Sequence, residues 1–128
     1  MDNKIYNRWI TEVPKVILQD VLVTLKGSNK VELAYVDYEL DRNNLKMVCG
    51  YGNILAYMNI QTVDKNKEGW HGDYIDEEEP EKDGRYIVCY EYNNYNKIKY
   101  RLAVGHWKKD RFVENREVVG WREFPKAI

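Results

Sequence analysis

The chain has 128 residues, which suits one compact domain or two small repeats that share a core. Its 20 Lys and Arg against 21 Asp and Glu leave a net charge of -1, which argues against a strongly basic nucleic-acid-binding protein. No apolar run approaches the length of about 18 residues that a membrane span needs, and the first residues lack an apolar signal segment. We therefore expect a cytoplasmic protein that makes no use of a membrane.

Alternating apolar residues predict β-strands through the first half of the chain. Strands are expected at 20–25 and 31–36, and the short turn that joins them makes a hairpin. A short strand is expected at 46–49, and another at 54–58 after a glycine-rich break. Helical signal is weak, because only Thr11 to Gln19 could form a turn or two.

The second half begins with a polar stretch, 61–68, and the segment Gly69-Trp70-His71-Gly72, which together are the best linker candidate. A strong strand is then expected at 85–92 and a second at 98–107, with a turn at 93–96. Shorter strands at 112–113 and 118–121 close the chain. The pattern predicts a mainly β fold, built of antiparallel sheets with few short helical turns.

The two halves resemble each other in the order of their landmarks. Each has a leading Trp, then a Pro, a strand pair and a terminal apolar-aromatic run, so that Trp9 corresponds to Trp70 and Tyr57 to Trp121. A unit of about 55 residues is marginal alone, so two such units should share a core. We expect two tandem, pseudo-symmetric repeats, 1–64 and 65–128, within one compact domain.

A family resemblance lies in the second half. Its landmarks are Pro80, Asp83-Gly84, the strand Tyr86-Ile87-Val88, the stretch from Ala103 to Trp107 and the closing Val118-Val119-Gly120-Trp121-Arg122-Glu123-Phe124-Pro125. These resemble a small phage and prophage domain of unknown function, the family numbered 551. The match covers about residues 70–126 well and 9–60 loosely, and Gly120 replaces the usual His. The resemblance implies a phage or prophage accessory protein that works in the bacterial cytoplasm, and it implies no activity.

Acidic residues are concentrated in one segment, because residues 73–83 hold seven acids and one Lys. A contiguous run of this kind is typical of an exposed, solvated loop. The functional alternative is a docking patch for a basic surface of a partner protein, made of Asp76, Glu77, Glu78, Glu79 and Glu81.

Basic residues are concentrated in another segment, because residues 97–111 hold six bases and one acid. Strand alternation places Lys97, Lys99, Arg101 and Trp107 on one face. Cations beside aromatic rings can hold a nucleotide or single-stranded nucleic acid. The simpler interpretation is a solvated strand face with a buried Trp. The candidate ligand-binding residues are Lys97, Lys99, Tyr100, Arg101, Trp107, Lys109, Trp121 and Arg122.

Motifs for catalysis or metal binding are absent from the sequence. Cys49 and Cys89 have no C-x-x-C spacing or neighbouring His, and both are expected to be reduced, buried thiols. His71 and His106 lie far apart in the chain, and Ser28 is in a turn without a G-x-S-x-G context. We expect no catalytic residues, no metal site and no cofactor.

Three functions remain after these exclusions. The first is a non-enzymatic interaction protein that binds a host protein and inhibits a bacterial defence complex, such as a CRISPR effector. The second is a small-ligand sponge for a nucleotide signal. The third is a single-stranded nucleic-acid binder that uses the basic aromatic strand. A homodimer stays open under each of them.

Overall fold

A computed structural model describes residues 6–11, 19–25, 27, 30–36, 54–73 and 75–128. All regular structure in these ranges is antiparallel β, with no helix among them, so the predicted fold class is confirmed. The strand expected at 46–49 lies outside the described residues. So does the helical turn expected at 11–19, apart from its two ends, and Gln19 begins a strand.

The chain divides into two compact units, one of residues 1–60 with 125–128 and one of residues 61–124. The first unit holds a sheet with the strand order β1-β4-β2-β3. Its strands are β1 (Trp9–Ile10), β2 (Gln19–Leu25), β3 (Val31–Val36) and β4 (Ile54–Met58). The hairpin and the 54–58 strand therefore form where the alternation predicted them.

Strand β2 is the centre of the first unit, because residues on both of its faces are inaccessible to solvent. Val21, Leu22 and Val23 are each 0% exposed. The end of the chain joins this unit through two hydrogen bonds. The Trp9 indole N–H donates to the backbone oxygen of Lys126 (3.0 Å), and the backbone N–H of Ile128 donates to Thr24 Oγ1 (3.3 Å).

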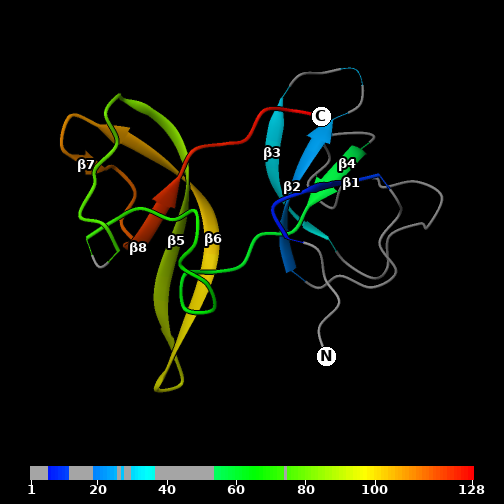
Figure 1. Ribbon diagram of the computed structural model, residues 1–128. Helices are drawn as coiled ribbons and strands as arrows, with labels where there is room; N and C mark the ends of the chain where they lie inside the picture. The colour runs from blue at the N-terminus through cyan, green and yellow to red at the C-terminus, as the bar shows by residue number, and fades with distance from the viewer. Residues whose placement is uncertain (1–5, 12–18, 26, 28–29, 37–53, 74) are drawn as a thin grey trace. The chain divides into compact units, whose positions relative to one another are not determined.

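The second unit holds a sheet with the order β7-β6-β5-β8 (Figure 1). Its long hairpin consists of β5 (Gly84–Asn94) and β6 (Lys97–Lys108), flanked by β7 (Arg111–Phe112) and β8 (Glu117–Arg122). The hairpin extends beyond both flanking strands. Two residues, Tyr95 and Asn96, form its turn, and both have positive φ (52° and 65°), as in the type I′ turns that suit twisted hairpins.

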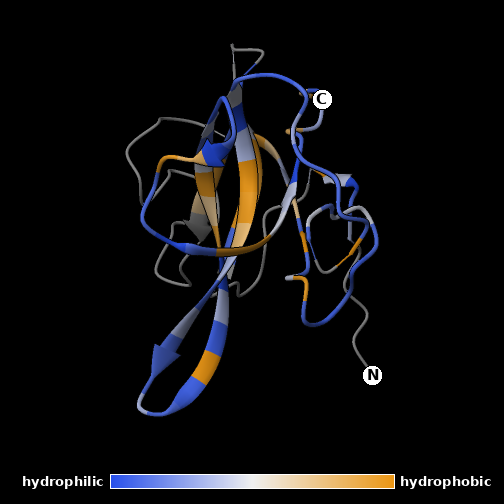
Figure 2. Ribbon diagram, turned by 90° about the vertical axis from the view of Figure 1, so that its left-hand side faces the viewer, coloured by the Kyte–Doolittle hydropathy of each residue, from blue (hydrophilic) through white to orange (hydrophobic). Residues whose placement is uncertain are grey.

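Both faces of the second sheet are buried near β8. This part of the hairpin is coloured as hydrophobic in Figure 2. Even-numbered residues of β5 and odd-numbered residues of β6 share one face, which we call the pocket face. Its core contains Tyr86, Val88, Ala103, Trp107 and Trp121. On the opposite face, Ile87 and Cys89 are each 0% exposed. The predicted alternation of β5 and β6 is confirmed.

The two sheets share one connectivity. In each, the first strand of a hairpin pairs on its other side with a later strand, giving β4-β2-β3 in one sheet and β8-β5-β6 in the other. Antiparallel sheets built on hairpins reach this order readily, so it does not confirm the expected tandem, pseudo-symmetric repeat. No helix in the described ranges is long and apolar enough to cross a membrane.

Candidate functional site

Aromatic rings on the pocket face form the floor of the candidate site. Trp121 packs edge-on against Tyr86, with ring centroids 5.3 Å apart, and Trp107 packs edge-on against Phe112 at 5.0 Å. Strand β5 pairs with β6 on one side and with β8 on the other, which places side chains of all three strands on this face. The short β7 pairs with β6 and adds Phe112 at the edge of the sheet. The two Trp residues are 7% and 8% exposed, so both are almost entirely buried.

Gly105 leaves room for the close packing of the aromatic rings in this floor. A Cβ at Gly105 would lie 2.6 Å from a methyl carbon of Val88 and 3.0 Å from a ring carbon of Phe112. Real Cβ atoms do not approach as closely as 2.6 Å, so a larger residue would displace Val88 and crowd Phe112. The absence of a side chain on β6 at this point therefore allows the aromatic rings to pack.

The acidic segment forms the wall of the site and is tied to β8. Trp121 donates its indole N–H to the backbone oxygen of Glu78 (3.0 Å). His71 forms two backbone hydrogen bonds with Trp121, each 2.9 Å long, and its ring lies 4.8 Å from the Trp121 ring. The segment that the sequence suggested as a linker therefore pairs with the last strand of the second unit.

Asp76 holds the segment in shape. Its carboxylate accepts hydrogen bonds from the backbone N–H of Gly72 (3.0 Å), from the backbone N–H of Glu78 (3.1 Å) and from Nδ1 of His71 (2.6 Å). The Gly72 bond, followed by the His71 bond, lowers the pKa of Asp76 to about 2. Asp76 therefore acts as an internal brace for the segment.

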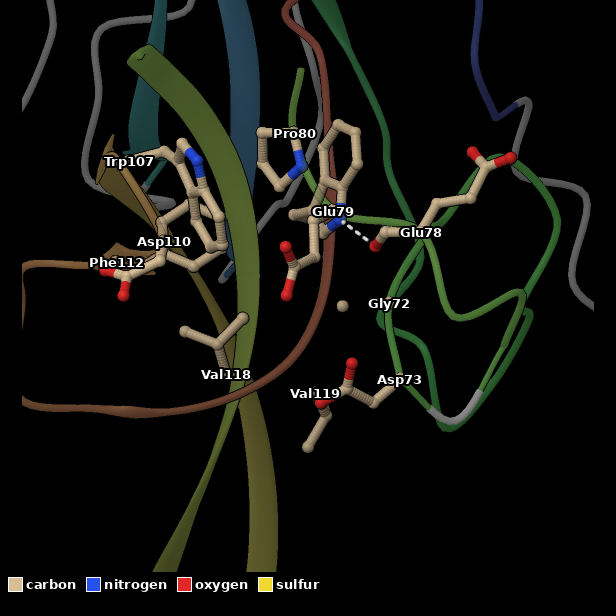
Figure 3. Close-up of a pocket in the computed structure, with 12 residues that line it drawn as sticks. Gly72, Asp73, Glu78, Glu79, Pro80, Trp107, Asp110, Phe112, Val118 and Val119 are labelled. Carbon is tan, nitrogen blue, oxygen red and sulfur yellow. Dashed lines mark hydrogen bonds between the residues drawn. The ribbon is translucent and has the colours of Figure 1, made fainter. Parts of the chain in front are cut away.

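A pocket of about 170 Å³ lies between the aromatic floor and the acidic wall (Figure 3). Its described lining contains four acids and no Lys or Arg; the acids are Asp73, Glu78, Glu79 and Asp110. The side chain of Glu79 points into the pocket, whereas the carboxylate of Glu78 points away from it. Among the described residues, no hydrogen bond or ion pair holds the Glu79 carboxylate. The pocket thus presents a carboxylate above aromatic rings.

The predicted acidic patch is distributed over different positions in the structure. Glu78 and Glu79 line the pocket, and Asp76 forms internal bonds. Glu77 and Glu81 are exposed and lie outside the pocket lining. Glu77 has a φ of 60°, which marks the bend of the loop.

The predicted basic set is also divided. Lys97, Lys99 and Arg101 lie on the outer part of the hairpin and share the pocket face, whereas Tyr100 lies on the opposite face. Lys109 follows β6 in a turn, where its backbone N–H donates to Asp83. Trp107 and Trp121 line the pocket with acids instead of bases.

Arg122 lies on the opposite face of the sheet from Trp121. Its guanidinium stands over the Trp70 ring, 5.4 Å from the centroid, and burial lowers the pKa of this group. Of the candidate ligand-binding residues expected from the sequence, Trp107 and Trp121 are therefore not brought to one place with Arg101 and Arg122 by the described structure.

Both histidines are paired with carboxylates. Nδ1 of His106 lies 2.6 Å from Glu114, and Nδ1 of His71 lies 2.6 Å from Asp76 and 3.4 Å from Glu78. Potential ligand atoms of His71, Asp76 and Glu78 lie within 4.8 Å of one another. The hydrogen bonds of Asp76 with His71, Gly72 and Glu78 explain why these three side chains lie close together, and no bound ion is needed to explain it.

Several lining residues were missed by the sequence reasoning. Asp73, Pro80, Asp110 and Phe112 come from three separate loops or strand ends, and only the sheet register brings them together. The available signal was the Trp70-His71 pair, whose large aromatic Trp is unusual for a simple linker. No protein family, curated protein or solved structure matches this chain.

Proposed function

We propose that this protein is a non-enzymatic binding protein whose pocket receives a cationic side chain from a basic surface of a partner protein. The single observation that carries the proposal is the Glu79 carboxylate, directed into a pocket whose floor is formed by Trp107 and Trp121. Carboxylates and aromatic faces are the two groups that attract a guanidinium or ammonium ion.

The energetics of such a site favour arginine. A cation over an aromatic ring gains roughly 0.5–2 kcal/mol, and a carboxylate can accept two parallel N–H bonds from a guanidinium. The wall is already braced by Asp76 and by the bond from Trp121 to Glu78, so binding requires little further ordering. A pocket built in advance makes even a small contact area useful for recognition.

The pocket fits one side chain better than a whole small molecule. Its volume of about 170 Å³ is below the range of roughly 300–1,000 Å³ typical of drug-sized ligand sites. A nucleotide would also bring phosphate groups toward Asp73, Glu79 and Asp110, where like charges repel. These features favour the protein-docking function over the nucleotide sponge.

The family resemblance directs the search for the partner toward bacterial proteins. Under this proposal the chain is a phage-type accessory protein in the cytoplasm of its host, and the partner presents an arginine from a basic surface. Bacterial defence complexes, such as CRISPR effectors, have basic surfaces of this kind because they bind nucleic acid. Inhibition of such a complex would follow if the docked arginine belongs to its nucleic-acid-binding surface.

The proposal can be tested on the pocket directly. The indole N–H signals of the protein are followed by NMR during titration with N-acetyl-arginine amide and, in parallel, with the neutral citrulline analogue of the same shape. We expect saturable shifts with arginine, with a Kd on the order of 1 mM for a single side chain, and little change with citrulline. Glu79→Gln should weaken this binding at least fivefold.

Glu81→Gln is the matched control, because it removes the same charge from the same segment outside the pocket lining. It should leave the titration within twofold of the wild type. Equal shifts with arginine and citrulline, or equal losses in the two variants, would contradict the proposal.

A further inference from the structure

The outer part of the β5–β6 hairpin carries cations and tyrosine rings on a single face. Three cross-strand pairs place them there, Tyr90 with Arg101, Tyr92 with Lys99 and Asn94 with Lys97. The three cationic residues are exposed, and the two tyrosines are half-buried. Hydrophilic colouring dominates this part of the hairpin in Figure 2, in contrast with the hydrophobic part beside β8.

The aromatic groups form a row along this face. The Tyr90 and Tyr92 rings lie 5.9 Å apart at an angle of 41°. The guanidinium of Arg116, from the loop before β8, lies over the Tyr90 ring at 4.5 Å from its centroid. A guanidinium held over a ring offers its own outer face for stacking, so Arg116 extends the row and adds another charge.

The outer part of the hairpin contributes no carboxylate of its own to this face. Glu91 is the one acid in residues 90–101, and it pairs with Tyr100 and Glu117 on the opposite face of the sheet. Phosphate groups that approached Lys97, Lys99 and Arg101 would therefore meet no carboxylate of the hairpin on the same face. Because the bases of the outer hairpin lie on one face of the sheet and its acid lies on the other, the basic face has a local positive field despite the net charge of -1.

The turn presents a further ring in an unfavourable backbone conformation. Tyr95 is 95% exposed and has a φ of 52°, in the left-handed region where Asn and Gly are the usual residues. A tyrosine gains nothing from packing at this position, and it makes the turn less stable than Asn would. The exposed ring is therefore available for contact with something outside the chain.

We infer that the outer β5–β6 hairpin binds single-stranded nucleic acid, with the bases stacked on Tyr92, Tyr95 and the Arg116 guanidinium and the phosphates beside Lys97, Lys99 and Arg101. Single strands are held in this way, by aromatic faces for the bases and cations for the backbone. A duplex offers no unpaired base faces, so the rings favour a single strand over a duplex. This surface is separate from the pocket and does not depend on the proposed function.

The inference is tested by fluorescence anisotropy with a labelled 12-nucleotide poly(dT) strand, over a series of salt concentrations. Three phosphate contacts predict a slope of log K against log salt of about -2 for a single strand. Lys97→Glu with Lys99→Glu should weaken binding at low salt roughly tenfold or more and make the slope shallower. The control carries Lys65→Glu with Lys67→Glu, which change the net charge equally at exposed positions of the same unit.

Tyr95→Asn separates recognition from folding. Because Asn tolerates positive φ, this variant should keep or raise the unfolding temperature while weakening binding about fivefold. Binding that is absent at low salt, equal losses in the two double variants, or equal affinity for the matching duplex would each overturn the inference. Unchanged affinity in Tyr95→Asn would show that the Tyr95 ring takes no part in binding, and it would contradict the inference as stated.

Discussion

The indole N–H of Trp121 donates a hydrogen bond to the backbone oxygen of Glu78, 3.0 Å away, and joins strand β8 to a loop 43 residues earlier in the chain. The same side chain packs against Tyr86 and His71. Trp121 is therefore both part of the pocket floor and the anchor of the acidic wall. We expect the position of the wall to depend on this one residue more than on the many charges of the loop.

Trp121→Phe tests that dependence. The phenyl ring keeps most of the apolar contact but leaves the Glu78 carbonyl without its donor, in a part-buried position. We expect a loss of about 1–2 kcal/mol in the free energy of unfolding. We also expect faster amide hydrogen exchange at residues 76–79, because the wall is no longer fixed to β8. Chemical denaturation and hydrogen exchange measure the two effects.

Trp9→Phe is the matched control for this substitution. It also removes an indole hydrogen bond to a backbone oxygen, that of Lys126, but this bond is exposed and belongs to the first unit. Its effect on stability should be smaller, and exchange at residues 76–79 should not change. Unaltered exchange in Trp121→Phe would show that the charges of the loop, or Asp76 alone, hold the wall.

Asp76 makes the stability of the loop dependent on pH at the acid end. Hydrogen bonds from the Gly72 N–H and from His71 lower its pKa from 3.8 to about 2. Because the folded-state pKa is the lower one, the ionised carboxylate adds stability that is fully present above about pH 4 and is lost as the pH falls through about 2. Urea unfolding between pH 2 and 5 should show this loss in the wild type.

Asp76→Asn supplies the comparison, since an amide keeps an acceptor oxygen but does not titrate. The wild type should be more stable than this variant at pH 5, and the difference should shrink toward pH 2. A difference that stays constant across the range would mean that the ionised form of Asp76 contributes nothing to folding.

Strand positions were predictable because local alternation determines them. The sequence of β5 and β6 contains enough alternating residues to assign faces, and the register agrees with those faces. The pocket was not predictable in the same way. It depends on the antiparallel bridge between His71 and Trp121 and on the bond from Trp121 to Glu78, which connect segments 50 and 43 residues apart.

The charge pattern of the sequence predicted where the acidic and basic segments lie in the chain. It could not predict which residues each charged side chain contacts in the fold. Asp76 and Glu79 are three residues apart in one acidic run, yet one braces the loop and the other points into the pocket. Trp107 lies in the basic segment of the sequence, but the acidic segment reaches its ring across the fold. Such pairings depend on loop geometry, which periodicity does not encode.

Cys89 should be almost inert in the folded protein. Its side chain is 0% exposed, and burial raises the pKa of its thiol from 9.0 to about 11. This shift alone lowers the thiolate fraction about a hundredfold, and exclusion of the reagent slows the reaction further. In a Cys49→Ser background, reaction with a disulfide reagent at pH 8 should be complete in denaturant and at least a hundredfold slower without it. Comparable rates in both conditions would contradict the burial of this strand.

Gly120 tests how closely the loop before the acidic segment packs on β8. A Cβ at this position would lie 2.7 Å from a methyl carbon of Val63 and 3.4 Å from the Trp70 ring, so a side chain as large as His could not be accommodated without displacing both. Gly120→Ala should cost about 1–3 kcal/mol in the free energy of unfolding, and Gly120→His should cost more. Gly84→Ala is the control, because a Cβ there would be 3.9 Å from Tyr86, an ordinary contact. Denaturation midpoints give the comparison, and equal midpoints for Gly120→Ala and Gly84→Ala would show that Val63 can move aside freely.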